Sequence, residues 1–292
     1  MDQAFLYCVG ATKAGTSWLY RTLADRPDVA LSAVKETHFW DTRDPDARRA
    51  QIEAFERQLR RFGTLCTEAE ERGQGWKVAN MSRRMADMNR LIAMMQDGSE
   101  EAYLNYVTAP AVAETRLVGD ICPAYGLLST GTLSEMLGAV PEARFLYLIR
   151  EPVSRLWSAV RMQADRQLQP GQTVEQKAHN ILHRVLNKGV ETHLTARGDY
   201  AGTVARLRAV VPAEQLRVMY MEELVTDAGY ASLCGWLGLP EVRAPVSEKV
   251  HEGQAIVIRP DLAEEAARQL ASQYAFAEAE VGPLPDAWRA RA

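Results

Sequence analysis

The chain has few of the side chains that most often bind metals or form disulfides. Its four cysteines are scattered without a C-x-x-C pair, and its five histidines include no H-E-x-x-H pattern. These absences exclude the usual local zinc motifs and a disulfide-stapled scaffold, and they indicate reduced, mostly buried thiols. His179 and His183 lie four residues apart, but without a third ligand they predict no metal site.

Long apolar runs and excess positive charge are also missing. No uninterrupted apolar stretch is long enough to span a bilayer, and the first apolar residues predict a strand rather than a signal peptide. The net charge of -4 argues against a nucleic-acid partner. We therefore expect a cytoplasmic protein without a membrane or nucleic-acid partner, in which local positive groups hold any anionic ligand.

What is present fits one large α/β domain. The 292 residues are 47% hydrophobic and 25% charged, which is ordinary for a globular chain. Short apolar runs alternate with segments of helical spacing, so we expect a three-layer sandwich with a mostly parallel central sheet between helices. The expected strands lie at residues 5–9, 29–31, 116–120 and 144–150, and a fifth begins at 216.

The segment GATKAGTS follows the first expected strand and resembles a phosphate-binding loop in which the lysine has moved. Gly10 and Gly15 have the spacing of G-x-x-x-x-G-K-[ST], and a hydroxyl pair follows. The position after the second glycine, however, is Thr16, and the lysine is Lys13 inside the loop. Such a loop directs backbone N–H groups and a helix dipole at an anion. The plain alternative is an ordinary turn between a strand and a helix.

A second polar segment, LIREPVSRLWS, follows the strand expected at 144–150. Arg150 stands at the strand end, Pro152 suits a helix start, and Ser154 and Ser158 share a helix face. An arginine with a helix hydroxyl can clamp a second, separate phosphate. The alternative is a surface arginine with two solvated serines.

Together the two segments resemble the sulfotransferases that use 3′-phosphoadenosine 5′-phosphosulfate (PAPS). In that family the first motif holds the 5′-phosphosulfate, with the lysine inside the loop, and the second binds the 3′-phosphate through its arginine and serine. The resemblance therefore implies PAPS as donor, PAP as product and no required metal. It assigns nucleotide binding to these residues: Lys13, Ala14, Gly15, Thr16, Ser17, Trp18, Arg150 and Ser158.

Two further segments extend the resemblance from about Phe5 to Asp227. VGDICPAY, residues 118–125, is similar to the family's G-E-x-[ST]-P-x-Y, and residues 198–227 are similar to its "YA…L…EQL…EDL" stretch. The family often has a lysine where Ile121 stands, so we interpret Asp120 and Tyr125 as structural. The resemblance implies one domain over residues 1–292, with a mainly helical acceptor-side insertion at about 42–115 and a helical lid at about 160–198.

The segment VKETHFWD, residues 34–41, offers a general base. It resembles the K-E-P-H-F-F of heparan-type and bacterial sulfotransferases, which implies that Glu36 is the base and that Lys13 and Glu36 are catalytic. His38 is the second candidate base, and the alternative for it is a structural ring. Thr37 replaces the family's proline. Lys35 either helps to hold the sulfuryl group or pairs with a carboxylate.

The acceptor is the least defined part of the prediction. A hydroxyl of a small molecule, lipid or carbohydrate fits the acidic chain, and a second copy of the chain is a candidate partner. The methionine-rich segment 81–95 is interpreted as core, with a pliable acceptor wall as the alternative. A weak late-loop match involves Lys249, His251 and Gly253, where surface charge is the alternative.

Two other functions remain open. One is a P-loop kinase or nucleotidase acting on ATP, which is disfavoured by the absence of lysine at Thr16 and of a clear Walker-B aspartate. The other is a nucleotide-binding protein without transfer activity.

Overall fold

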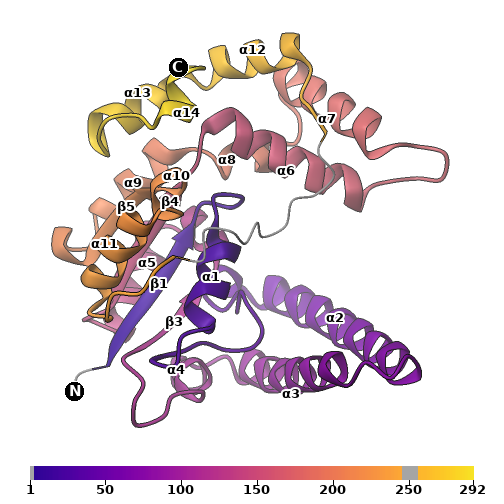
Figure 1. Ribbon diagram of the computed structural model, residues 1–292, viewed down its shortest axis with the longest axis vertical. Coiled ribbons are helices and arrows are strands. Elements are labelled where there is room, and N and C mark those ends of the chain that lie inside the picture. The colour runs from indigo at the N-terminus through magenta and orange to yellow at the C-terminus, as the bar shows by residue number, and fades with distance from the viewer. Residues whose placement is uncertain (1–2, 245–255) are drawn as a thin grey trace.

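A five-stranded parallel sheet forms the centre of the protein (Figure 1). The computed structural model describes residues 3–244 and 256–292. In these residues the strand order is β2-β3-β1-β4-β5, and every pairing is parallel. The strands are β1 (Ala4–Gly10), β2 (Val29–Ala30), β3 (Leu117–Ile121), β4 (Arg144–Ile149) and β5 (Leu216–Tyr220). The predicted fold class is therefore confirmed.

The central strands are apolar because helices cover both of their faces. Leu6, Tyr7, Cys8 and Val9 of β1 are fully buried, and the predicted strand 144–150 is the equally buried β4. The main core extends from this sheet into the surrounding helices.

The strand order has its switch point between β1 and β4. The chain leaves β1 toward β2 on one side of the sheet, and it leaves β4 toward β5 on the other. Parallel α/β sheets bind ligands at such a switch point, beyond the carboxyl ends of the strands. Both polar segments singled out in the sequence follow these two strands.

Helices occupy most of the remaining chain. They are α1 (Thr16–Ala24), α2 (Pro45–Glu71), α3 (Gly75–Asp97), α4 (Glu100–Thr108), α5 (Thr130–Ala139), α6 (Pro152–Arg166), α7 (Val174–Lys188), α8 (Thr192–Ala196), α9 (Tyr200–Arg208), α10 (Met221–Leu224), α11 (Asp227–Leu237), α12 (Pro260–Gln269), α13 (Ala271–Glu280) and α14 (Asp286–Arg289). In the described part of the chain, none of them combines the length and the apolar character that crossing a membrane requires.

The two longest helices, α2 and α3, lie side by side and extend away from the sheet (Figure 1). Asp44 begins α2 by accepting hydrogen bonds from two backbone N–H groups, and Gly98 ends α3 in the left-handed conformation. The methionines of α3 are core residues, as interpreted from the sequence: Met81, Met88, Met94 and Met95 are buried and Met85 is partly buried.

A second, smaller core joins α6, α7 and α12 on the opposite side of the molecule (Figure 1). Val160 of α6, Leu182 of α7 and Ala266 of α12 are among its fully buried members. This packing fixes α6, which carries Ser158, against the C-terminal helices.

Candidate active site

The loop between β1 and α1 leaves the N-terminus of α1 without a side-chain cap. Gly15 stands at the cap position with φ 89°, and no side chain hydrogen-bonds there. A Cβ on Gly15 would lie 2.8 Å from Met221 Cγ, so the loop needs glycine for its backbone and for the space. The first N–H groups of α1 are thus available to an anion.

Lys13 lies at the crown of this loop in the left-handed conformation, with φ 72°. Its ammonium group is partly buried, 3.9 Å from the sulfur of Met162. Burial, and then the positive charges of Arg150, Arg161 and Arg166, lower the pKa of Lys13 below its ordinary value. The surroundings of Lys13 are therefore rich in positive charge that an anionic ligand would neutralise.

Arg150 connects the two polar segments directly. Its guanidinium donates a hydrogen bond to the carbonyl oxygen of Lys13 at 3.3 Å, across 137 residues of sequence. Tyr200 fixes the backbone at Arg150 by donating its hydroxyl to the carbonyl oxygen at 2.6 Å. The arginine predicted to clamp a phosphate thus lies at the edge of the phosphate loop.

The two serines of α6 have different surroundings. Ser154 receives a hydrogen bond from Arg291 near the C-terminus, at 3.4 Å, whereas Ser158 is buried in the next turn. Glu151 caps α6 by accepting from the N–H groups of Val153 and Ser154. Because a carboxylate already occupies this N-terminus, the predicted phosphate clamp is left to the side chains of Arg150 and Ser158.

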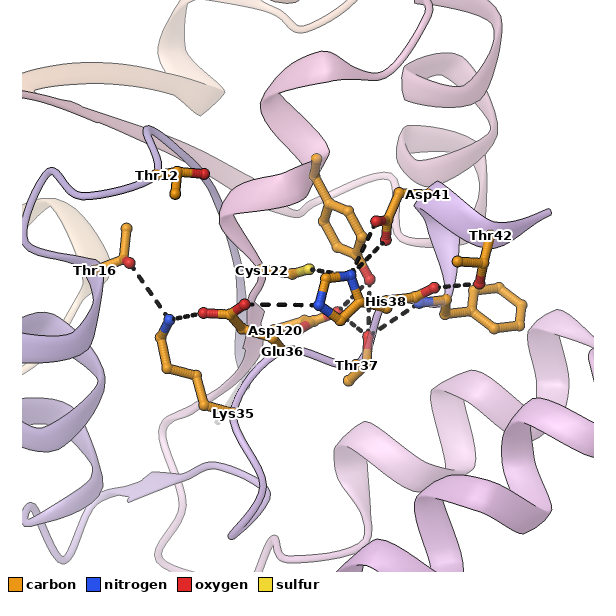
Figure 2. A network of polar contacts seen from close by, with 12 residues as sticks. Thr12, Thr16, Lys35, Glu36, Thr37, His38, Asp41, Thr42, Asp120 and Cys122 are labelled. Carbon is orange, nitrogen blue, oxygen red and sulfur yellow. Dashed lines mark hydrogen bonds and ion pairs between the residues drawn. The ribbon is translucent and has the colours of Figure 1, made fainter. Parts of the chain in front are cut away.

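The segment 34–41 faces the loop, as the sequence predicts (Figure 2). The Lys35 ammonium lies 3.4 Å from the Thr16 hydroxyl and contacts the Glu36 carboxylate. Lys35 therefore links the loop to the predicted base.

Glu36 lies between two cationic groups. One carboxylate oxygen contacts Lys35, and the other lies 3.6 Å from His38 Nε2. Burial alone would raise the pKa of Glu36, but His38 and Lys35 together lower it to about 2. The carboxylate is therefore ionised at neutral pH.

The other nitrogen of His38, Nδ1, faces Asp41 at 2.9 Å and Cys122 Sγ at 3.8 Å. Burial disfavours the imidazolium, but the Cys122 sulfur and the carboxylates of Asp41 and Glu36 raise the pKa of His38 above its ordinary value. A protonated ring cannot accept another proton. This geometry favours Glu36 over His38 as the base.

Lys13, Glu36 and His38 also share a strained backbone conformation. Among the described residues, left-handed φ angles occur outside glycine at Lys13, Glu36, His38 and Glu191. Such a conformation costs about 1–3 kcal/mol per residue and is common at functional sites. Three of the four strained residues are those that the sequence analysis names as catalytic.

A buried hydrogen-bond network holds the turn between Glu36 and His38. Thr37 donates its hydroxyl to Asp120 at 2.6 Å, and Asp120 also accepts from Tyr125 and Tyr103. Burial raises the pKa of Asp120, and these three hydroxyls oppose that effect. The hydroxyl of Thr37 thus anchors a turn where the family's motif has proline, and Asp120 and Tyr125 occupy structural positions.

Several arginines near the loop were not identified from the sequence. Arg197 donates to the Thr12 hydroxyl at 3.1 Å. Arg161 and Arg166 lower the pKa of Lys13 from α6. Helical spacing from Ser158 could have identified these two, because residues three, four and eight positions along share its face. Arg197 follows no comparable signal.

Other sequence candidates lie apart from this site. The Nε2 atom of His179 accepts a hydrogen bond from the backbone N–H of Arg259 at 3.3 Å, and its ring lies 5.0 Å from that of Trp157. His179 thus has a structural role between α7 and α12. The late-loop residues Lys249, His251 and Gly253 lie outside the described residues.

A comparison with protein-family models identifies one family. A family model described as "Sulfotransferase family" matches residues 6–243. The crystal structure of a sulfotransferase from Alicyclobacillus acidocaldarius has the same fold, with 24% identity, a TM-score of 0.62 and 99% of each chain covered. No curated protein matches the chain.

Two sulfotransferase domains have lower structural similarity. The domain from the curacin biosynthetic pathway is 14% identical with a TM-score of 0.43, covering 91% of this chain and 78% of that one. The domain from the Synechococcus PCC 7002 olefin synthase is 17% identical with a TM-score of 0.46, covering 94% of each chain.

Proposed function

The chain belongs to the sulfotransferase family, and from this premise we propose that it transfers a sulfuryl group from PAPS to an acceptor hydroxyl, giving PAP and a sulfate ester. The observation that carries the proposal is the hydrogen bond between Arg150 and the carbonyl oxygen of Lys13. It supports the proposal because it joins the arginine that follows β4 to the loop that follows β1, at the switch point of the sheet.

The donor's two anionic groups have matching partners. The uncapped N-terminus of α1 and Lys13 suit the 5′-phosphosulfate, because the N–H groups of that turn have no side-chain acceptor. Arg150 and Ser158 suit the 3′-phosphate. The cap formed by Glu151 leaves this second clamp to side chains alone.

The reaction needs a proton acceptor and a cation at opposite ends of the transferred group. As the acceptor oxygen bonds to sulfur, its proton passes to the Glu36 carboxylate. The bond between sulfur and the phosphate oxygen breaks, and Lys13 stabilises the negative charge that develops on that oxygen. The sulfuryl group thus moves from one oxygen to another without a required metal.

The neighbours of Glu36 position it. His38 lies against one carboxylate oxygen and is itself held by Asp41. Lys35 contacts the other oxygen and also the Thr16 hydroxyl of the loop. If Lys35 turns toward the sulfuryl group when the donor binds, Glu36 loses a stabilising cation and becomes a stronger base.

The kinase alternative conflicts with the residue at position 16. In ATP-dependent loops, this position carries a lysine that contacts the outer phosphates. Here it carries the Thr16 hydroxyl, which lies 3.4 Å from the Lys35 ammonium.

Transfer of labelled sulfate tests the proposal. Wild-type protein is incubated with ³⁵S-labelled PAPS and a panel of hydroxylated small molecules, lipids and sugars, and parallel reactions contain γ-labelled ATP. We expect a labelled sulfate ester that Lys13→Ala and Glu36→Gln do not form. Phosphate transfer from ATP, or sulfate esters formed equally by both variants, would contradict the proposal.

A further inference from the structure

Three metal-ligand side chains meet beside the proposed base, from segments far apart in the sequence (Figure 2). The donor atoms of His38, Asp41 and Cys122 all lie within 4.8 Å of one another. His38 and Cys122 are separated by 84 residues, so no local cysteine or histidine spacing could reveal the group.

The distances suit a small tetrahedral ion. Zinc bond lengths place a nitrogen and a sulfur ligand about 3.6 Å apart, and a nitrogen and an oxygen ligand about 3.4 Å apart. His38 Nδ1 lies 3.8 Å from Cys122 Sγ and 3.2 Å from Asp41 Oδ1. Both distances from His38 Nδ1 are thus within a few tenths of an ångström of these values, and the Asp41 and Cys122 donor atoms lie within 4.8 Å of each other.

The surroundings of the three ligands support the same conclusion. A histidine that binds a metal through one nitrogen usually donates its other N–H to a carboxylate, and His38 Nε2 faces Glu36 at 3.6 Å. Cys122 is fully buried, and its backbone N–H bonds to the Cys8 carbonyl oxygen at 3.1 Å. The side chains of His38 and Asp41 are each 22% exposed, which leaves a route for an ion.

We propose that His38 Nδ1, the Asp41 carboxylate and the Cys122 thiolate form a binding site for Zn²⁺, with a water molecule as the fourth ligand. A mixed nitrogen, oxygen and sulfur set suits this borderline-soft ion. On binding, the Cys122 thiol and His38 Nδ1 release any protons they carry to solvent, while Nε2–H stays directed at Glu36. The site is additional to the sulfuryl transfer, which needs no metal.

Direct metal titration tests this proposal independently of PAPS. Purified, metal-free protein is titrated with Zn²⁺ in competition with a chromophoric chelator, and separately with Co²⁺ while thiolate-to-cobalt charge-transfer absorption is recorded. We expect one ion per chain and a thiolate band. Loss of a supporting carboxylate typically weakens metal binding by about 10–100-fold, so Cys122→Ser should weaken Zn²⁺ at least about 10-fold and remove the band.

Two other cysteines provide matched controls. Cys8 is equally buried on the neighbouring strand, and Cys66 is half-buried beside Glu70, where a metal could bind adventitiously. Cys8→Ser and Cys66→Ser should both keep the affinity and the band. His38→Gln and Asp41→Asn should weaken Zn²⁺ binding without touching the thiol, which provides a test even if Cys122→Ser fails to fold.

Two outcomes would overturn the proposal. One is wild-type protein that binds Zn²⁺ no more tightly than Cys122→Ser or shows no thiolate band. The other is loss of the band in Cys66→Ser, which would show that the ion binds at that cysteine. Neither outcome bears on donor binding, which is measured with PAP in the presence of a chelator.

Discussion

Lys13 is the residue at which this loop departs from those of nucleoside triphosphatases. Its position at the crown, beside the Arg150 guanidinium, leaves the hydroxyl at the start of α1 to Lys35. The two cations thus have different neighbours: the Lys13 ammonium lies near Met162 of α6, and the Lys35 ammonium lies near Thr16. In our account, Lys13 stabilises the negative charge on the leaving phosphate oxygen, and Lys35 connects the loop to Glu36.

The lowered pKa of Lys13 predicts a basic limit to activity. Lys13 must be protonated to stabilise the leaving oxygen, so kcat/KM for PAPS should fall as pH rises through a pKa below the ordinary lysine value of about 10.4. Lys13→Arg should move this basic limb of the pH–rate profile to higher pH, because arginine stays charged. A series of kcat/KM measurements against pH gives the profiles of the wild type and of Lys13→Arg. Lys188→Arg, on the exposed end of α7, is the control. A limb unmoved by Lys13→Arg would contradict this role.

Glu36→Gln separates catalysis from donor binding. The amide keeps the shape of the side chain but cannot take a proton, so transfer should fall about 10²–10⁴-fold. PAP affinity should stay within about threefold, because Glu36 is assigned no contact with the nucleotide. Rates and calorimetric titrations of wild type and variant check the two parts. A large loss of PAP affinity, or transfer near the wild-type rate, would disprove the assignment.

Arg150→Ala should weaken the binding of a nucleotide with a 3′-phosphate more than the binding of one without it. Hydrogen bonds to charged groups contribute about 1.5–3 kcal/mol, so PAP should weaken about 10–150-fold and ADP much less. Arg144→Ala, at the opposite end of β4, is the matched control and should change neither affinity. Equal weakening of both nucleotides by Arg150→Ala would show that this arginine does not read the 3′-phosphate.

At the scale of elements, the contrast between α1 and α6 decides which helix end can bind an anion. Gly15 begins α1 without a side-chain cap, whereas Glu151 caps α6 and is itself buried against Tyr274 and Arg291. Two helices follow neighbouring strands, yet only the first leaves its N–H groups to a ligand.

Removing the cap of α6 should lower stability more than removing an exposed cap. Glu151→Ala leaves two N–H groups and the Tyr274 hydroxyl without their acceptor, so the free energy of unfolding should fall by about 2–4 kcal/mol. Asp44→Ala, at the exposed start of α2, should cost about 1 kcal/mol. Urea unfolding of both variants gives the comparison. Equal decreases in the free energy of unfolding would contradict the larger contribution to stability assigned to Glu151.

Much of the element order is predictable because it depends on local signals. Apolar runs predicted β1 and β4, and a proline at the first position predicted the start of α6. The Glu151 cap was missed, since its partners Tyr274 and Arg291 come from the far end of the chain. The contact of Arg197 with Thr12 and the meeting of His38 with Cys122 likewise depend on folding.

At the scale of the whole molecule, the sheet order places the site. The sequence predicted parallel strands with polar residues at their ends, but it could not show that β1 and β4 are neighbours with connections leading in opposite directions. That arrangement brings Lys13 and Arg150 into contact in a protein of net charge -4. In our account, local concentration of cations, rather than overall charge, is what binds the anionic donor.

The most direct test of this account is calorimetric titration of the wild-type protein with PAP and with ADP, with magnesium chelated. ADP lacks the 3′-phosphate for which Arg150 and Ser158 are proposed. We predict tight binding of PAP and at least about tenfold weaker binding of ADP, without any requirement for magnesium. Equal binding of the two nucleotides, or binding only when magnesium is present, would contradict the account and favour an ATP-dependent enzyme.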